Sequence, residues 1–281
     1  MIPVSAPLSP ARRRPAKPAS LEELRRFLAP PLSHAGKSRF FSFGLPLDKN
    51  LPRQGLSLES LHEVHAATPE DLPAAFGFLA ALAVSASPSG SVFVISSAQS
   101  LAATGQLYGH GLNGLGLDPS RLTLVEARHE AEAFWAIEET LRSGAVSVPL
   151  GLIAQNFDLK TSQRLSLAAR EAKRLLLVLR PPGSTAASAA ETRWRIAAAP
   201  ARRDATGGLS EHRAEKCDAV FGQPDAQNKE RWRVALERCR NGSSGEWVLE
   251  WLHASHRFSL AAAMADPAFP GGAGAVQRNS A

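Results

Sequence analysis

The chain has 281 residues, 44% of them hydrophobic, and its 32 basic and 26 acidic side chains leave a net charge of +6. This length is enough for one sizeable hydrophobic core with appendages. No apolar run approaches the roughly 20 residues that cross a bilayer, and the N-terminus lacks the apolar segment of a secretory signal, so a cytoplasmic protein is expected. The two cysteines, Cys217 and Cys239, lie in no CxxC motif or Cys/His cluster, which argues against a structural zinc site.

The positive charge is concentrated at the N-terminal end. Residues 1–40 hold eight basic and two acidic side chains, a difference that equals the net charge of the whole chain, so the remainder is balanced. A basic arm rich in Pro and Ala could contact nucleic acid without sequence preference, and a solvated, partly disordered tail is the other interpretation. The candidate DNA contacts in this arm are Arg12, Arg13, Arg14 and Lys17.

Strand and helix patterns alternate through the middle of the chain. This alternation predicts an α/β fold with a mostly parallel sheet flanked by helices. The expected inner face of the first helix is Leu72, Phe76, Leu79 and Ala83, and that of the second is Ala131, Phe134, Ile137 and Leu141. Strands are expected at 60–64, 91–96, 121–127, 145–153 and 174–180, and helices at 69–85, 129–143 and 158–172.

The pattern changes in the C-terminal third. "TRWRIAAA" alternates with period two, and "RWRVALERC" and "EWVLEW" flank the turn "NGSSG", which predicts a terminal antiparallel hairpin. Residues 200–229 are polar and predict a long loop. The expected organisation is a basic arm at 1–40, one α/β domain at 41–265 and a disordered tail at 266–281.

The stretch "LHEVHAATPEDLPAAFGFLA" reads as a strand, a tight turn and a helix, the arrangement in which phosphate-binding loops occur. Such a loop needs glycines, a lysine and a Ser/Thr hydroxyl. Here Thr68 suits the N-cap and Pro69 the first helical position, while the carboxylates of Glu70 and Asp71 stand where a phosphate would bind. Nucleotide binding at this turn is not expected.

A second phosphate-loop ending occurs in "HAGKS" at 34–38. Pro31 stands where the first glycine of that motif is required, and no apolar strand precedes it. We interpret this segment as a basic loop.

Several stretches resemble the ImuA family, the RecA/SulA-related accessory proteins of inducible bacterial mutagenesis. They run in order over about residues 43–266 and include "LPLDKNLPRQGLSLESLHEV", "FDLKTSQRLSLAAREA" and "GEWVLEWLHASHRFSLAAAMAD". The resemblance implies a degenerate RecA-like core without a cofactor, in a cytoplasmic, nucleoid-associated adaptor of error-prone translesion DNA synthesis. It implies as partners an ImuB-type polymerase homologue and an error-prone alpha-type DNA polymerase, with RecA as a further candidate.

Comparison with active recombinases indicates three losses. Leu72 and Pro73 stand where the phosphate lysine and its hydroxyl neighbour would be. The strand "VFVIS" is followed by Ser97, Ala98 and Gln99 instead of a glutamate, and no carboxylate follows the strand "VSVPLGLI" before Asp158. Because three separate parts of a phosphoryl-transfer site are missing, no ATPase activity is expected.

Other sites have weaker signals. His62 and His65 are spaced poorly for a metal, which would need further ligands, and His65 is expected to pack under the turn. Leu112, Leu115 and Leu117, among glycines, form either an exposed loop surface or a cover for the sheet edge.

The C-terminal segment carries the candidate partner site. Trp247, Leu249 and Trp251 point to one face of a strand, and a tryptophan-rich core is the simpler interpretation of these side chains. His256, Arg257 and Phe258 follow, and we expect them to bind a partner from a helix that leaves the sheet. A SulA-like cell-division inhibitor, or a weak ATP-dependent, recombinase-like DNA-binding protein, remains the alternative function.

Overall fold

The computed structural model describes residues 39–105, 107–200 and 230–261. The candidate DNA contacts Arg12, Arg13, Arg14 and Lys17, the "HAGKS" segment, most of the predicted 200–229 loop and the predicted tail lie outside these residues. Within them, no helix is long and apolar enough to span a membrane.

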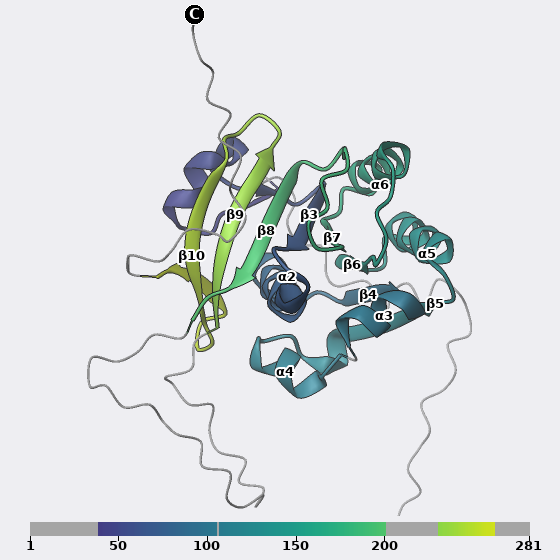
Figure 1. The fold of residues 1–281 in the computed structure, drawn as a ribbon, viewed down its shortest axis with the longest axis horizontal. Helices are drawn as coiled ribbons and strands as arrows, with labels where there is room; N and C mark the ends of the chain where they lie inside the picture. Colours follow the sequence, from purple (N-terminus) through teal and green to yellow (C-terminus); the bar gives the residue numbers. More distant parts are fainter. Residues whose placement is uncertain (1–38, 106, 201–229, 262–281) are drawn as a thin grey trace, which may run out of the picture.

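One nine-stranded sheet organises the fold, in the order β11-β10-β9-β8-β3-β7-β6-β4-β5 (Figure 1). The strands from β8 to β5 are parallel, and the first of them in the chain, β3, lies between β7 and β8. The predicted α/β class with a RecA-like, mostly parallel core is confirmed. These strands are β3 (Leu61–Ala66), β4 (Val92–Ser97), β5 (Leu122–Ala127), β6 (Val148–Leu152), β7 (Leu176–Arg180) and β8 (Thr192–Ala198).

Helices cover both faces of the parallel half. The turn η3 (Pro69–Asp71) leads into α2 (Leu72–Ala86) on one face, and α5 (Glu130–Ser143) and α6 (Leu159–Ala172) lie together on the other (Figure 1). Buried apolar side chains form one cluster on each face. The short elements α3 (Ala98–Thr104), α4 (Gly109–Gly114) and η4 (Pro119–Arg121) connect β4 to β5.

Two details of the predicted helix faces differ from the structure. On α5 the buried alanine is Ala133, and the predicted Ala131 is exposed. On α2, Leu72 and Phe76 are half-buried, whereas Phe78 is completely buried. The second difference arises because Leu115 and Leu117 of the α4 region and the segment before β3 join the same apolar cluster as α2, so α2 is buried over most of its circumference.

The antiparallel end contains one more strand than the predicted hairpin. β9 (Arg231–Cys239) and β10 (Gly245–Leu252) flank the five-residue connection at 240–244 as predicted, and β11 (Arg257–Leu260) then pairs with β10. The predicted exit helix is therefore wrong. Arg257–Leu260 alternates with period two, and Phe258 lies opposite Trp251 and buries its ring, so this segment stays in the sheet.

The segment before β3 packs against the sheet on the α2 face. It contains β1 (Phe40–Phe41) paired with β2 (Leu56–Ser57), and between them the turns η1 (Pro46–Asn50) and η2 (Pro52–Gln54). The buried Asp48 carboxylate holds this segment together by accepting hydrogen bonds from the backbone N–H groups of Phe43 and Gly44 at 3.0 and 2.8 Å.

Candidate functional site

The turn after β3 is closed by a side chain of the protein itself. Asp71 Oδ2 accepts hydrogen bonds from the backbone N–H and the hydroxyl of Thr68, at 3.2 and 3.0 Å, which makes a capping box with Thr68 at the predicted N-cap. Asp71 Oδ1 accepts a further bond from the backbone N–H of Ala198 at 2.8 Å. The carboxylate therefore stands in front of the helix start, where an anion would otherwise bind, and ties the turn to the end of β8.

A carboxylate also lies beside the ends of β4 and β6, but it comes from another element. Glu130, the first residue of α5, accepts hydrogen bonds at Oε1 from the hydroxyls of Ser97 and Ser100 at 2.8 and 3.0 Å. The same oxygen accepts from the backbone N–H of Ala154 at 3.0 Å. Sequence reasoning missed Glu130 because it searched for carboxylates directly after β4 and β6. Asp158, the next carboxylate after β6, instead caps α6 through the N–H of Thr161.

A small apolar hollow is left at this carboxyl edge. Its volume is about 40 Å³, and its walls include Leu72, Leu152, Leu179, Pro181 and Pro182. Typical ligand clefts have volumes of about 300–1,000 Å³ and place several polar groups around the ligand. Two residues therefore occupy the positions at which a phosphate loop has its lysine and hydroxyl. Leu72 lines the apolar hollow, and Pro73 lies in the first turn of α2.

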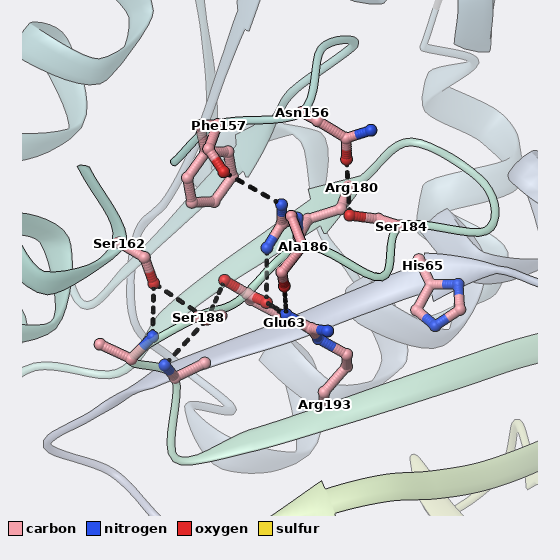
Figure 2. Close-up of polar contacts among 12 residues, drawn as sticks. Glu63, His65, Asn156, Phe157, Ser162, Arg180, Ser184, Ala186, Ser188 and Arg193 are labelled. Carbon is pink, nitrogen blue, oxygen red and sulfur yellow. Dashed lines mark hydrogen bonds and ion pairs between the residues drawn. The ribbon is translucent and has the colours of Figure 1, made fainter. Parts of the chain in front are cut away.

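Behind this edge lies a buried ionic network centred on Glu63 of β3, which sequence reasoning did not single out (Figure 2). Glu63 Oε2 lies 3.0 Å from Arg180 Nη1 and 3.1 Å from Arg193 Nη2, and its Oε1 accepts a hydrogen bond from Ser188 Oγ at 2.6 Å. Arg193 also donates to the carbonyl of Ala186 at 2.6 Å. The network anchors the β7–β8 loop to the central strand, so its role is to hold this edge of the sheet in place.

His62 and His65 both lie on β3 and point to opposite faces of the sheet. His62 Nδ1 and Thr192 Oγ1 are 2.7 Å apart, and His62 Nε2 donates to the carbonyl of Ser57 at 2.8 Å. Burial lowers the pKa of His62 to about 4. His65 is buried and pairs with Glu237 at 2.8 Å, and in the described part of the chain no group of three His, Cys, Asp or Glu residues could hold a metal ion.

The β10–β11 turn and the α4 region, which the sequence presents as separate candidates, are in contact. His253 Nδ1 donates to the carbonyl of Gly114 at 2.7 Å. The ring of His256 packs on Gly116, where a Cβ atom would lie 2.6 Å from it and where φ is +89°. The position of Gly116 therefore favours glycine, which lets the turn pack against the loop.

Together the two segments form one surface, here called the His–Gly surface. Leu112, Leu115 and Leu117 are buried beneath it, so these leucines cover the sheet and do not form an exposed loop surface. Tyr108 is 70% exposed and its ring lies 5.4 Å from that of His110. The exposed side chains of the surface are Tyr108, His110, Asn113 and His256. Arg257 is exposed beside it at the start of β11, on the sheet face opposite that of Phe258.

Comparison with known proteins decides the family. The chain is 35% identical over 243 residues to Protein ImuA of Caulobacter vibrioides, in each of two strains, and the match covers 80% of this chain and 90% of the relative. The chain belongs to the ImuA family. No protein-family model matches it.

In this ImuA-family chain, the three candidate partner residues have different surroundings. His256 is exposed on the His–Gly surface, and Arg257 is exposed on the other face of β11. Phe258 is 5% exposed, and its ring lies 5.0 Å from Trp251 and 5.4 Å from Phe78. Trp194, Trp232 and Trp251 belong to the same apolar cluster, so the tryptophan-rich core interpretation holds for this region. Phe258 packs the antiparallel end, and the partner role stays a prediction for the two exposed residues.

Proposed function

We propose that this ImuA-family protein is a non-enzymatic adaptor in damage-induced translesion DNA synthesis. Its proposed partners are an ImuB-type polymerase homologue and an error-prone alpha-type DNA polymerase, with RecA as a further candidate. Family membership supports the pathway. The proposed location is cytoplasmic, at the nucleoid.

The proposal that the protein is not an enzyme rests on the position of the Asp71 carboxylate. An ATPase of this fold needs backbone N–H groups and a cation at the turn after β3, and here an anionic side chain occupies that place through bonds to Thr68 and Ala198. The helix start carries Leu72 and Pro73, which offer neither a charge nor a hydroxyl. We therefore expect that the protein neither binds nor hydrolyses ATP.

A hydrolysis assay on the purified full chain tests this part. We expect no release of phosphate above background. The second phosphate-loop ending, "HAGKS", lies outside the described residues, so the same assay is also run on the variant Lys37→Ala, which removes its lysine. Activity in the wild type that disappears in this variant would contradict the proposal.

The partner-binding part is assigned to the His–Gly surface. Tyrosine and arginine are enriched among residues that dominate interface energies. Tyr108 is exposed on this surface, and Arg257 is exposed next to it on the other face of β11, in the segment that the His253–Gly114 bond holds against the α4 region. Neither side chain belongs to the apolar core, so both can be removed while the fold is kept.

The test is capture of the ImuB-type partner from damaged cells by the tagged full chain. A double variant, Tyr108→Ala with Arg257→Ala, should reduce capture tenfold or more, since about 1.4 kcal/mol corresponds to tenfold. The matched control, Trp135→Ala with Arg128→Ala, also removes an exposed aromatic and an exposed arginine, but from the α5 region. Equal capture by both double variants would place the partner surface elsewhere.

A further inference from the structure

A second edge of the sheet carries an open cleft that the proposed adaptor function does not use. It lies at the amino ends of β3 and β8, opposite the edge closed by Asp71, and has a volume of about 460 Å³. This volume falls within the range of about 300–1,000 Å³ that small-molecule sites occupy. The side chains that matter here are Arg39, Phe40, Arg53, Glu59, Glu191 and Asn241.

The charges in the cleft are only partly neutralised. Arg39 Nε pairs with Glu59 at 2.7 Å, and Glu191 accepts bonds from Ser60 Oγ at 3.1 Å and from Arg170 at 3.4 Å. Arg53, by contrast, has no acidic partner among the described residues and lies with its guanidinium 5.2 Å from the centre of the Phe40 ring.

Further positive charge adjoins the cleft. Arg39 also donates to the carbonyl of Lys173 at the end of α6. Burial and the positive charge of Arg39 lower the pKa of Arg174, the residue that follows Lys173. Like charges held in proximity attract an anion, so we expect this edge to attract anions.

The backbone around the cleft is unusual. Arg53 and Gln54 are consecutive residues with φ of 56°, and Asn241 across the cleft has φ of 61°. A positive φ is uncommon for residues other than glycine, and such conformations gather at sites that clamp a ligand. In this conformation the Arg53 guanidinium lies over the Phe40 ring.

We propose that this cleft binds single-stranded DNA. A phosphate lies against the unpaired charge of Arg53, and an unstacked base lies on the flat Arg53–Phe40 pair, since guanidinium and aromatic planes both stack bases. Glu191 and the Asn241 side chain offer acceptors to the N–H groups of a base. An acidic peptide could reach these acceptors only through its backbone N–H groups and has no base to stack on the Arg53–Phe40 pair, and the bases of a duplex are already stacked and paired.

The first test measures binding of a fluorescein-labelled oligothymidylate to the full chain by anisotropy over a range of salt concentrations. Arg53→Glu should weaken binding about tenfold and flatten the slope of log K against log salt by about 0.7, the value for one phosphate of a single strand. Arg128→Glu makes the same charge change at the other edge of the sheet and should change affinity less than twofold. Equal effects of the two variants would overturn the proposal.

Arg53→Gly separates binding from folding. Glycine adopts a positive φ without strain, so this variant should unfold at the same temperature as the wild type or a higher one, yet bind the oligonucleotide as weakly as Arg53→Glu. Wild-type affinity in Arg53→Gly would show that the guanidinium is not a DNA contact.

Photocrosslinking locates the bound strand. An oligonucleotide containing 5-iodouracil should crosslink to the peptide that contains Phe40. Crosslinks confined to residues 1–38 would place binding on the arm alone and overturn the proposal. Displacement of the oligonucleotide by polyglutamate at equal charge would overturn it as well, in favour of an acidic protein segment.

Discussion

The two edges of the parallel sheet differ in how their polar groups are used. At the carboxyl edge, Asp71 and Glu130 bind hydroxyls and backbone N–H groups of the protein itself and leave a hollow of about 40 Å³. At the amino edge, a cleft of about 460 Å³ retains an unpaired Arg53. The difference shows that a fold can close the turn at which a phosphate would bind and still keep an open polar cleft elsewhere.

The largest expected effect concerns the network behind the closed edge. Glu63→Ala should lower the free energy of unfolding by about 3–5 kcal/mol, because it leaves Arg180 and Arg193 buried without their carboxylate. Urea denaturation measures this loss. Glu126→Ala, at an exposed position on β5, should change the same free energy by no more than about 0.5 kcal/mol.

At the antiparallel end, the neighbouring residues Phe258 and Arg257 should contribute very differently to the stability of the fold. Phe258→Ala should cost about 3–5 kcal/mol of folding free energy, because it empties a site between Trp251 and Phe78. Arg257→Ala, at an exposed position, should stay within about 0.5 kcal/mol of the wild type. If thermal denaturation showed both variants to be equally stable, Phe258 would not belong to the core.

The buried His62 should make the fold sensitive to acid. Its pKa is lowered from 6.5 to about 4 by burial, so the unfolded chain binds a proton more readily than the folded one between these values. The contribution is complete above pH 6.5 and is lost as pH falls toward 4, with a total of about 3 kcal/mol. The difference in unfolding free energy between wild type and His62→Gln should therefore shrink as pH falls, and a constant difference would contradict this.

The smallest effect on the folding free energy is expected when the Asp71 carboxylate is removed from the turn after β3. Asp71→Ala removes the capping interaction and the bond to Ala198, and should cost about 0.5–2 kcal/mol of folding free energy. Because Leu72 and Pro73 remain, isothermal titration should still detect no ATP binding. Binding in this variant would show that the carboxylate alone keeps nucleotide out.

Much of the fold could be predicted, because its signals are local. Short apolar runs and period-3.6 patterns placed the parallel strands and the helices α2, α5 and α6 within a few residues, and Thr68-Pro69-Glu70-Asp71 indicated the closed turn. The short helices α3 and α4 were not predicted. The prediction failed at β11, because a period-two alternation over only four residues is too short to decide between a strand and a helix. There the pairing of Phe258 with Trp251, a contact across the sheet, decides the structure.

The candidate sites depended far more on the tertiary structure. Residue types alone identified the missing lysine and hydroxyl at Leu72 and Pro73, since a phosphate site needs those groups at fixed spacing. The position of Glu130 beside Ser97, the contact of His253 with Gly114 across 139 residues, and the unpaired Arg53 in its cleft were not visible in the chain. They depend on the order of strands in the sheet, which brings together segments whose separation along the chain carries no information about their distance in space.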